Sequence, residues 1–106
     1  MYASIRRYGL EPGKMDDLLH RVDTEFAEEI SAMDGFVAYE VLDCGNDELM
    51  TISMFQDRQG AEASVQAAAV WIRDYLPDIR IDRTDARTGE VAVSRAREAV
   101  LEPAHH

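Results

Sequence analysis

Hydrophobic residues recur every three or four positions in two stretches of the chain, and this spacing predicts two amphipathic helices. The first helix is predicted over residues 14–33, with an apolar stripe formed by Met15, Leu19, Val22, Phe26, Ile30 and Met33. The second is predicted from an N-cap at Asp57 to Leu76, with a stripe formed by Ala61, Val65, Ala68, Ile72, Tyr75 and Leu76. Gly35 and Pro77 follow these helices and are typical helix-terminating residues.

Five runs rich in β-branched, aromatic or other apolar residues, bounded by turn-forming residues, predict strands. They cover residues 2–8, 36–42, 48–55, 79–83 and 89–94, with a loop over residues 85–88. The second and third strands are joined by a short turn over residues 43–47, which predicts an antiparallel hairpin. Both carry apolar residues on their two faces, a pattern typical of a sheet that is covered on both sides.

The element order predicts an α+β fold of the ferredoxin-like βαββαβ type with an extra C-terminal strand. We expect one domain over residues 1–95 and a tail over residues 96–106. Two helices on one face of an antiparallel sheet leave the other face open, and an exposed apolar face is typical of an interface. The simplest cover is a second copy related by a two-fold axis, so we predict a homodimer whose two sheets form a barrel-like core.

Charge and composition exclude several classes of partner. The 106 residues include 21 acidic and 11 basic side chains, for a formal net charge of -10. This charge disfavours nucleic acids and anionic membrane surfaces, and no apolar run reaches the roughly 20 residues of a membrane span. The sequence shows no secretory signal, and its single cysteine, Cys44, is typical of a reducing compartment, so we expect a cytoplasmic protein.

Five short segments resemble the antibiotic biosynthesis monooxygenase-type domain of the dimeric α+β barrel superfamily. They are residues 6–8 (RRY), 34–39 (DGFVAY), 50–55 (MTISMF), 69–72 (AVWI) and 88–91 (TGEV). The likeness covers residues 2–95 and depends more on element order than on any one motif. It implies a small dimer with a pocket between helices and sheet in each subunit.

The resemblance implies several functions. Some members of this family resemble cofactor-free oxygenases that act on electron-rich aromatic polyketides, others degrade haem, and others have no known reaction. The haem-degrading branch typically pairs an asparagine with a tryptophan on the second helix. The predicted second helix carries Trp71 but no asparagine, which argues against haem degradation.

One tryptophan, two tyrosines and one of two adjacent arginines are candidates for a small-molecule site. Trp71 either stacks on a flat substrate or fills the core between helix and sheet. Tyr39 and Tyr8 offer phenol groups that could bind a substrate oxygen or transfer a proton, or they are ordinary strand tyrosines. Arg6 and Arg7 point to opposite faces of a strand, so one of them faces a covered side and needs a carboxylate or an anionic ligand.

His20 is a further candidate for substrate binding, because its imidazole titrates near neutral pH; the alternative is a residue at the solvent boundary. The three histidines have no metal-ligand spacing, so we predict no metal. Our first hypothesis is a monooxygenase without a tightly bound cofactor that acts on a small phenol, quinol or anthrone, with Tyr39 and Arg6 as catalytic residues and Trp71, Tyr8 and His20 as substrate-binding residues. The alternatives are a non-catalytic homodimeric ligand-binding module and an isomerase or lyase.

Overall fold

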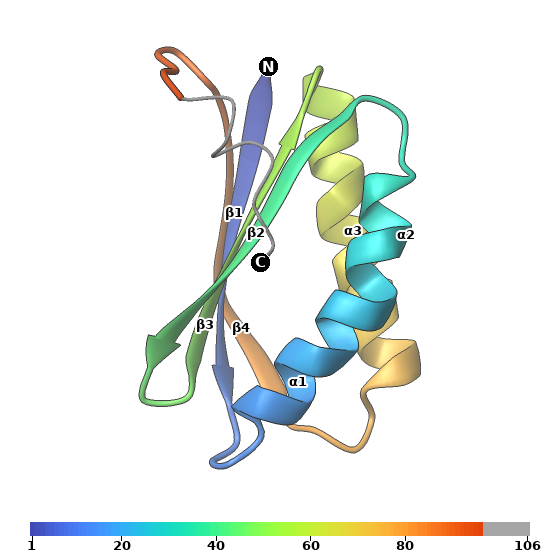
Figure 1. Ribbon diagram of the computed structural model, residues 1–106, viewed down its shortest axis with the longest axis vertical. Helices are drawn as coiled ribbons and strands as arrows, with labels where there is room; N and C mark the ends of the chain where they lie inside the picture. Colours follow the sequence, from blue (N-terminus) through green and yellow to red (C-terminus); the bar gives the residue numbers. More distant parts are fainter. Residues whose placement is uncertain (97–106) are drawn as a thin grey trace.

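The computed structural model describes residues 1–96, which form one antiparallel sheet and a layer of helices (Figure 1). The elements are β1 (Tyr2–Leu10), α1 (Met15–Arg21), η1 (Val22–Phe26), α2 (Ala27–Ser31), β2 (Phe36–Gly45), β3 (Glu48–Phe55), α3 (Arg58–Tyr75) and β4 (Ile81–Glu90). Counting α1, η1 and α2 as one helical run, this is the predicted βαββαβ order. The ferredoxin-like α+β fold is therefore confirmed.

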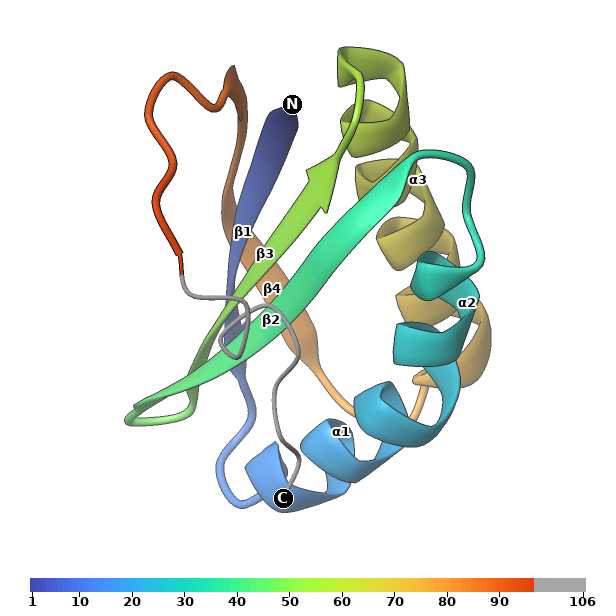
Figure 2. The ribbon, with the colours of Figure 1, turned by 45° about the horizontal axis from the view of Figure 1, so that its top comes forward.

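The sheet has the strand order β2-β3-β1-β4, and every neighbouring pair is antiparallel. The helices lie on one face of it, as predicted (Figure 2). Strand β3 shows the consequence for burial, because Leu49, Thr51, Ser53 and Phe55 are buried while the residues between them are only half-buried. Alternate side chains of a strand point to opposite faces, so these four residues face the helices.

The first predicted helix forms as one run of 17 residues, but its central turn, η1, is a π-helix. Four residues on this run are buried at intervals of four: Leu18, Val22, Phe26 and Ile30. An interval of four is longer than the 3.6 residues of an α-helical turn, so the buried stripe would drift around a regular helix. A turn with i→i+5 hydrogen bonds holds more residues and keeps the stripe on one face. The prediction missed Leu18, which is fully buried. The predicted stripe residues that are only half-buried but pack against the core are Met15, Leu19 and Met33.

Helix α3 begins and ends where the sequence predicts. The carboxylate of Asp57 accepts a hydrogen bond of 2.7 Å from the backbone N–H of Gly60, which is an N-cap interaction. Gly60 lies so close to the sheet that a Cβ atom there would come within 2.8 Å of the Phe55 ring. Tyr75 was wrongly placed in the buried stripe, since it is 58% exposed. None of the helices in residues 1–96 is long and apolar enough to cross a bilayer.

The C-terminal part of the sheet differs from the prediction. In place of a fourth strand, a loop and a fifth strand, β4 is one continuous strand that pairs with β1 along its length. It accommodates a bulge opposite Arg7 and Tyr8, where the hydroxyl of Thr84 donates to the carbonyl of Arg7. Residues 89–90 belong to β4 and residues 91–96 lie outside any strand, so the extra strand is absent from the described residues. The part of the predicted tail beyond residue 96 lies outside the described residues.

The face of the sheet opposite the helices carries apolar side chains that no helix of residues 1–96 covers. Ile5 on β1 is paired with Ile52 on β3, and both point away from the helices. Ile5 and Leu42 are each 41% exposed on this face. The expectation of an open apolar sheet face therefore agrees with the structure of the single chain.

Candidate functional site

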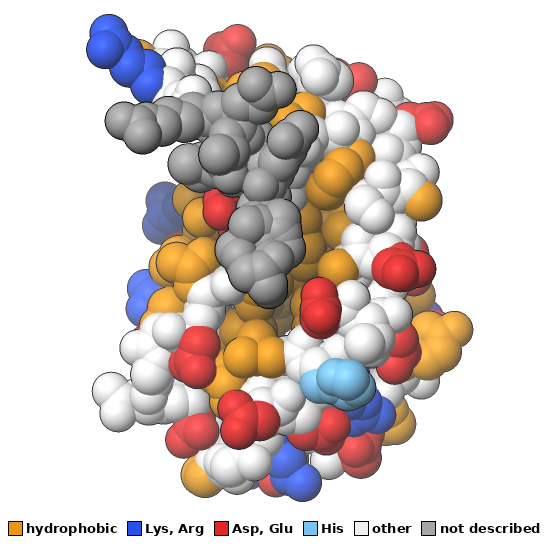
Figure 3. All heavy atoms as spheres, in the orientation of Figure 1, with side chains coloured by type: hydrophobic (Ala, Val, Ile, Leu, Met, Phe, Trp, Pro, Cys, Tyr) orange, Lys and Arg blue, Asp and Glu red, His pale blue; other side chains and the backbone are white. Residues whose placement is uncertain are grey.

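A small cavity lies between the helical face of the sheet, the α1–η1 segment and α3. The volume open to the centre of a water molecule is about 20 Å³, which is room for one or two waters. Its lining residues are Arg6, Tyr8, Leu18, Val22, Phe26, Tyr39, Leu49, Thr51, Ala68, Trp71, Ile72 and Ile81. In Figure 3, hydrophobic side chains are visible between the helical layer and the sheet, with acidic side chains spread over the helical side.

Among residues 1–96, Arg6 is the one charged residue that lines this cavity, and it has no exposed surface. Its Nε donates to Thr51 Oγ1 at 2.9 Å, its Nη2 to Ser53 Oγ at 2.8 Å and its Nη1 to the carbonyl oxygen of Ser64 at 3.0 Å. All three acceptors are neutral. Burial lowers the pKa of Arg6, while nearby Tyr8 partly opposes this shift. An arginine nevertheless remains charged at physiological pH, so the cavity wall carries a positive charge.

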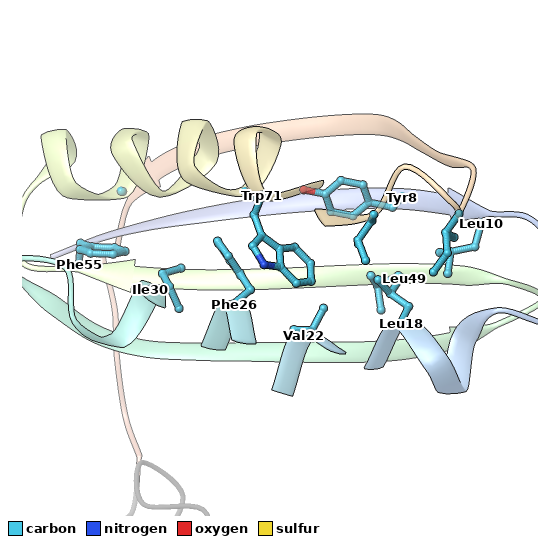
Figure 4. Packing of buried hydrophobic residues seen from close by; sticks show 13 residues of the cluster. Tyr8, Leu10, Leu18, Val22, Phe26, Ile30, Leu49, Phe55 and Trp71 are labelled. Carbon is cyan, nitrogen blue, oxygen red and sulfur yellow. The ribbon is translucent and has the colours of Figure 1, made fainter. Parts of the chain in front are cut away.

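An aromatic cluster forms the opposite part of the wall. The ring of Phe26 on η1 lies 5.4 Å from the ring of Trp71 and 5.7 Å from that of Tyr39, measured between centroids. Figure 4 shows Phe26 and Trp71 side by side, with Tyr8 further along the same row of buried side chains. Trp71 is only 4% exposed and belongs to the hydrophobic core. Trp71 is therefore a core residue that also forms part of the cavity wall. Filling the core and stacking on a ligand are compatible roles for it.

The two cavity tyrosines remain protonated. Burial raises the pKa of Tyr39 far above its ordinary value of 10.0, although the charge of Arg6 lowers it in part. Burial also raises the pKa of Tyr8, again against the effect of Arg6. Neutral phenols donate hydrogen bonds, so both residues can stabilise a negative charge on a ligand, but neither is a base near neutral pH.

The structure brings together four of the five predicted site residues: Arg6, Tyr8, Tyr39 and Trp71. His20 is exposed on α1 and does not line the cavity.

The sequence reasoning missed Thr51, Ser53 and Ser64, the three residues that hold the guanidinium, and it assigned Phe26 only to the core. One signal for the first two was present, because Thr51 and Ser53 occupy alternate positions of an otherwise apolar strand.

Within residues 1–96, no three histidine, cysteine, aspartate or glutamate side chains converge as a metal site would require. The polar groups that line the cavity are one guanidinium, two phenols and the hydroxyl of Thr51, beside aromatic walls. Such a set suits a flat organic molecule with at least one oxygen.

A sequence model described as antibiotic biosynthesis monooxygenase matches residues 1–70, which is about two-thirds of the chain. The matched span contains Arg6, Tyr8, Phe26 and Tyr39, whereas Trp71 and β4 lie just beyond it. No curated protein sequence matches the chain significantly.

Several solved structures share the fold at low sequence identity. A protein of unknown function from Nitrosomonas europaea is 17% identical, with a TM-score of 0.70 over 91% of this chain and 93% of that one. A dimeric ferredoxin-like protein from an uncultured marine organism is 10% identical, with a TM-score of 0.69 over 92% of this chain and 100% of that one. SnoaB, a cofactor-independent oxygenase from Streptomyces nogalater, is 12% identical, with a TM-score of 0.62 over 88% and 94% of the two chains. At these identities the likeness establishes the fold alone.

Proposed function

The chain belongs to the antibiotic biosynthesis monooxygenase family, and on that premise we propose that it oxidises a small electron-rich aromatic compound, of the phenol, quinol or anthrone type, without a tightly bound cofactor. Family membership supports a monooxygenase-type function. The observation that supports this substrate class is the cavity itself, in which aromatic walls surround one buried guanidinium and two neutral phenols. The structural likeness to a cofactor-independent oxygenase agrees with this proposal.

In this proposal, the cavity walls move apart when the substrate binds, because the observed space holds only one or two waters. Trp71 then stacks on the aromatic ring of the substrate, and Arg6 and Tyr39 stabilise the negative charge on its oxygen. The electron-rich carbon of the substrate anion gives electrons to O2 and forms a carbon–oxygen bond. The resulting peroxide takes up a proton. It then loses the remaining hydrogen of that carbon as a proton and the outer oxygen as hydroxide, which together make water. One oxygen atom ends in the product carbonyl and the other in water, so no external reductant is needed.

Oxygen uptake with an anthrone as the test substrate examines this function. We expect uptake of one O2 per product and, with ¹⁸O2, one labelled atom in the product. Replacement of Trp71 by Phe should lower kcat/KM by roughly threefold to tenfold, because an aromatic contact contributes about 0.5–1.5 kcal/mol beyond its burial. Tyr75→Phe is the matched control, since Tyr75 lies on the same helix but is 58% exposed.

One observation favours the second candidate, a non-catalytic ligand-binding module. The described part of the cavity lining contains no histidine or carboxylate that could act as a general base. Anthrone binding without oxygen uptake above the spontaneous rate would refute the oxygenase proposal and support the module. Conversion of a substrate without oxygen would instead indicate an isomerase or lyase.

We also propose that the open sheet face is covered by a second copy of the chain. Ile5, Ile52 and Leu42 form an uncovered apolar surface there, and one structural relative is a dimeric ferredoxin-like protein. Ile5→Lys should convert the dimer into a monomer, because it would place a charge in the apolar centre of the interface. Val70→Lys is the control, since Val70 is similarly exposed, at 44%, but lies on α3. Native mass spectra that show a wild-type monomer at micromolar concentration would refute this assembly.

A cytoplasmic location is the last part of the proposal. It is supported by Cys44, which is exposed and forms no disulfide in the described structure. A free surface thiol is typical of a reducing compartment. Fractionation of the producing cells, with the protein detected by antibody, tests the location.

A further inference from the structure

The charge of Arg6 lacks a counter-ion in the part of the chain that the structure describes. Six ion pairs occur among residues 1–96, and none of them includes Arg6. A guanidinium has five N–H donors, and Arg6 donates three hydrogen bonds, which leaves two N–H groups for another acceptor. A buried charge without a partner costs several kcal/mol, so its presence in the wall of a cavity indicates that an anion completes the site.

Within residues 1–96, the cavity lining contains no base that could produce that anion from a neutral ligand. The titratable or charged groups that act on Arg6 are Tyr8 from β1, Tyr39 from β2 and Arg83 from β4. Both tyrosines are protonated because burial disfavours their charged forms. The neighbours on β3 and α3 are hydroxyl, carbonyl and apolar groups, and η1 contributes only apolar side chains to the lining.

We propose that the cavity takes up its ligand as a preformed anion, a phenolate or enolate, and that Arg6 selects this form over the neutral acid. The inference rests on the proposed function and specifies its substrate class: an aromatic compound acidic enough to ionise in water. The protein then needs no general base. The pH dependence of binding follows the acidity of the ligand, and a ligand that ionises at lower pH binds at lower pH.

The test uses 4-nitrophenol, which ionises near neutral pH and changes its absorption spectrum when it does. Titration of the ligand with and without excess protein, in the absence of oxygen, gives its pKa in the bound and free states. We expect the protein to lower the ligand pKa by about one unit, which corresponds to about tenfold tighter binding of the anion. The neutral analogue 4-nitrotoluene should bind at least about tenfold more weakly than the phenolate.

Two variants of Arg6 test whether its guanidinium causes the shift in ligand pKa. Arg6→Gln should abolish the shift in ligand pKa, whereas Arg6→Lys, which keeps a positive charge, should retain part of it. Arg7→Gln is the matched control, because Arg7 lies next in sequence, points to the opposite face and pairs with Glu48 at the surface. It should leave the ligand pKa shift unchanged. Circular dichroism checks that each variant is folded.

The possible results separate this inference from the proposed function. An unchanged or raised ligand pKa in the wild-type protein would overturn the inference, even if Arg6→Gln failed to fold. A shift that persists in folded Arg6→Gln would also overturn it. Because binding is measured without turnover, a lowered ligand pKa without any oxygen uptake on anthrone would support the anion site and refute only the oxygenase activity.

Discussion

Removal of the Phe26 ring should enlarge the cavity by the space of one aromatic ring. Phe26 has 2% exposure, and its ring lies between those of Trp71 and Tyr39, where a flat ligand would stack. The Phe26→Ala substitution should cost about 3–5 kcal/mol of unfolding free energy, since it removes a buried aromatic side chain and leaves a cavity. A domain of this size has roughly 5–15 kcal/mol of stability, so the variant should remain folded.

Benzene tests whether the space vacated by Phe26 is a ligand site. At a benzene concentration ten times its Kd for the variant, linkage adds about 1.4 kcal/mol, which should raise the Tm of Phe26→Ala by roughly 5–10 °C. The wild type should gain less, because its Phe26 ring still occupies part of the space. Benzene should also change the fluorescence of Trp71, the only tryptophan. Phe55→Ala is the control, because Phe55 is fully buried but lies away from Trp71 in the same core (Figure 4). The reasoning fails if benzene neither stabilises Phe26→Ala nor changes its fluorescence.

Three further substitutions test the packing, the hairpin and the buried phenol. Gly60→Ala should lower the free energy of unfolding in urea by about 1 kcal/mol, because the steric clash of the new Cβ with Phe55 outweighs the gain of about 1 kcal/mol in helix propensity. Gly89→Ala is the control, since a Cβ atom at Gly89 would meet open space. An unchanged urea midpoint for Gly60→Ala would contradict this prediction. Asp47→Gly should raise the free energy of unfolding by about 0.5–1 kcal/mol, because Asp47 has a φ of +59° in the two-residue turn between β2 and β3, a conformation that glycine adopts without strain. A lower Tm in thermal unfolding would refute the assignment of strain. The raised pKa of Tyr39 contributes stability below pH 10, the ordinary pKa of a tyrosine, and this contribution is lost as the pH rises further. In urea unfolding, Tyr39→Phe should therefore lose less stability than the wild type between about pH 9 and pH 11. Equal losses would count against a buried phenol.

The fold was predictable in those elements whose buried face requires apolar residues at regular positions of the sequence. Helix α3 and the hairpin of β2 and β3 have apolar residues at helical or strand positions, and their predicted bounds agree closely with the structure. Strand β4 has the sequence IDRTDARTGE and faces solvent along most of its length, so it carries no alternating apolar pattern. Its position is set by backbone pairing with β1, which no local pattern of side chains records.

The site was predictable only in part, because its polar contacts depend on strand register. The alternation of β1 indicated that either Arg6 or Arg7 faces a covered side, and the structure shows that Arg6 does. A one-residue change in register would have exchanged them, and the sequence does not fix the register in advance. In the observed register Arg6 lies opposite Thr51 on β3.

Strand β3 nevertheless carries a signal that could be used on other sequences. Its inward positions are Leu49, Thr51, Ser53 and Phe55, so two hydroxyl side chains occupy places where the alternating pattern calls for apolar residues. Buried hydroxyl groups need hydrogen-bond partners, and a pair of them two residues apart can accept from one large donor on the neighbouring strand. Together with an arginine on an adjacent strand, such a pair predicts a buried guanidinium. When no carboxylate pairs with that guanidinium, an anionic ligand in the cavity beside it is the partner we propose.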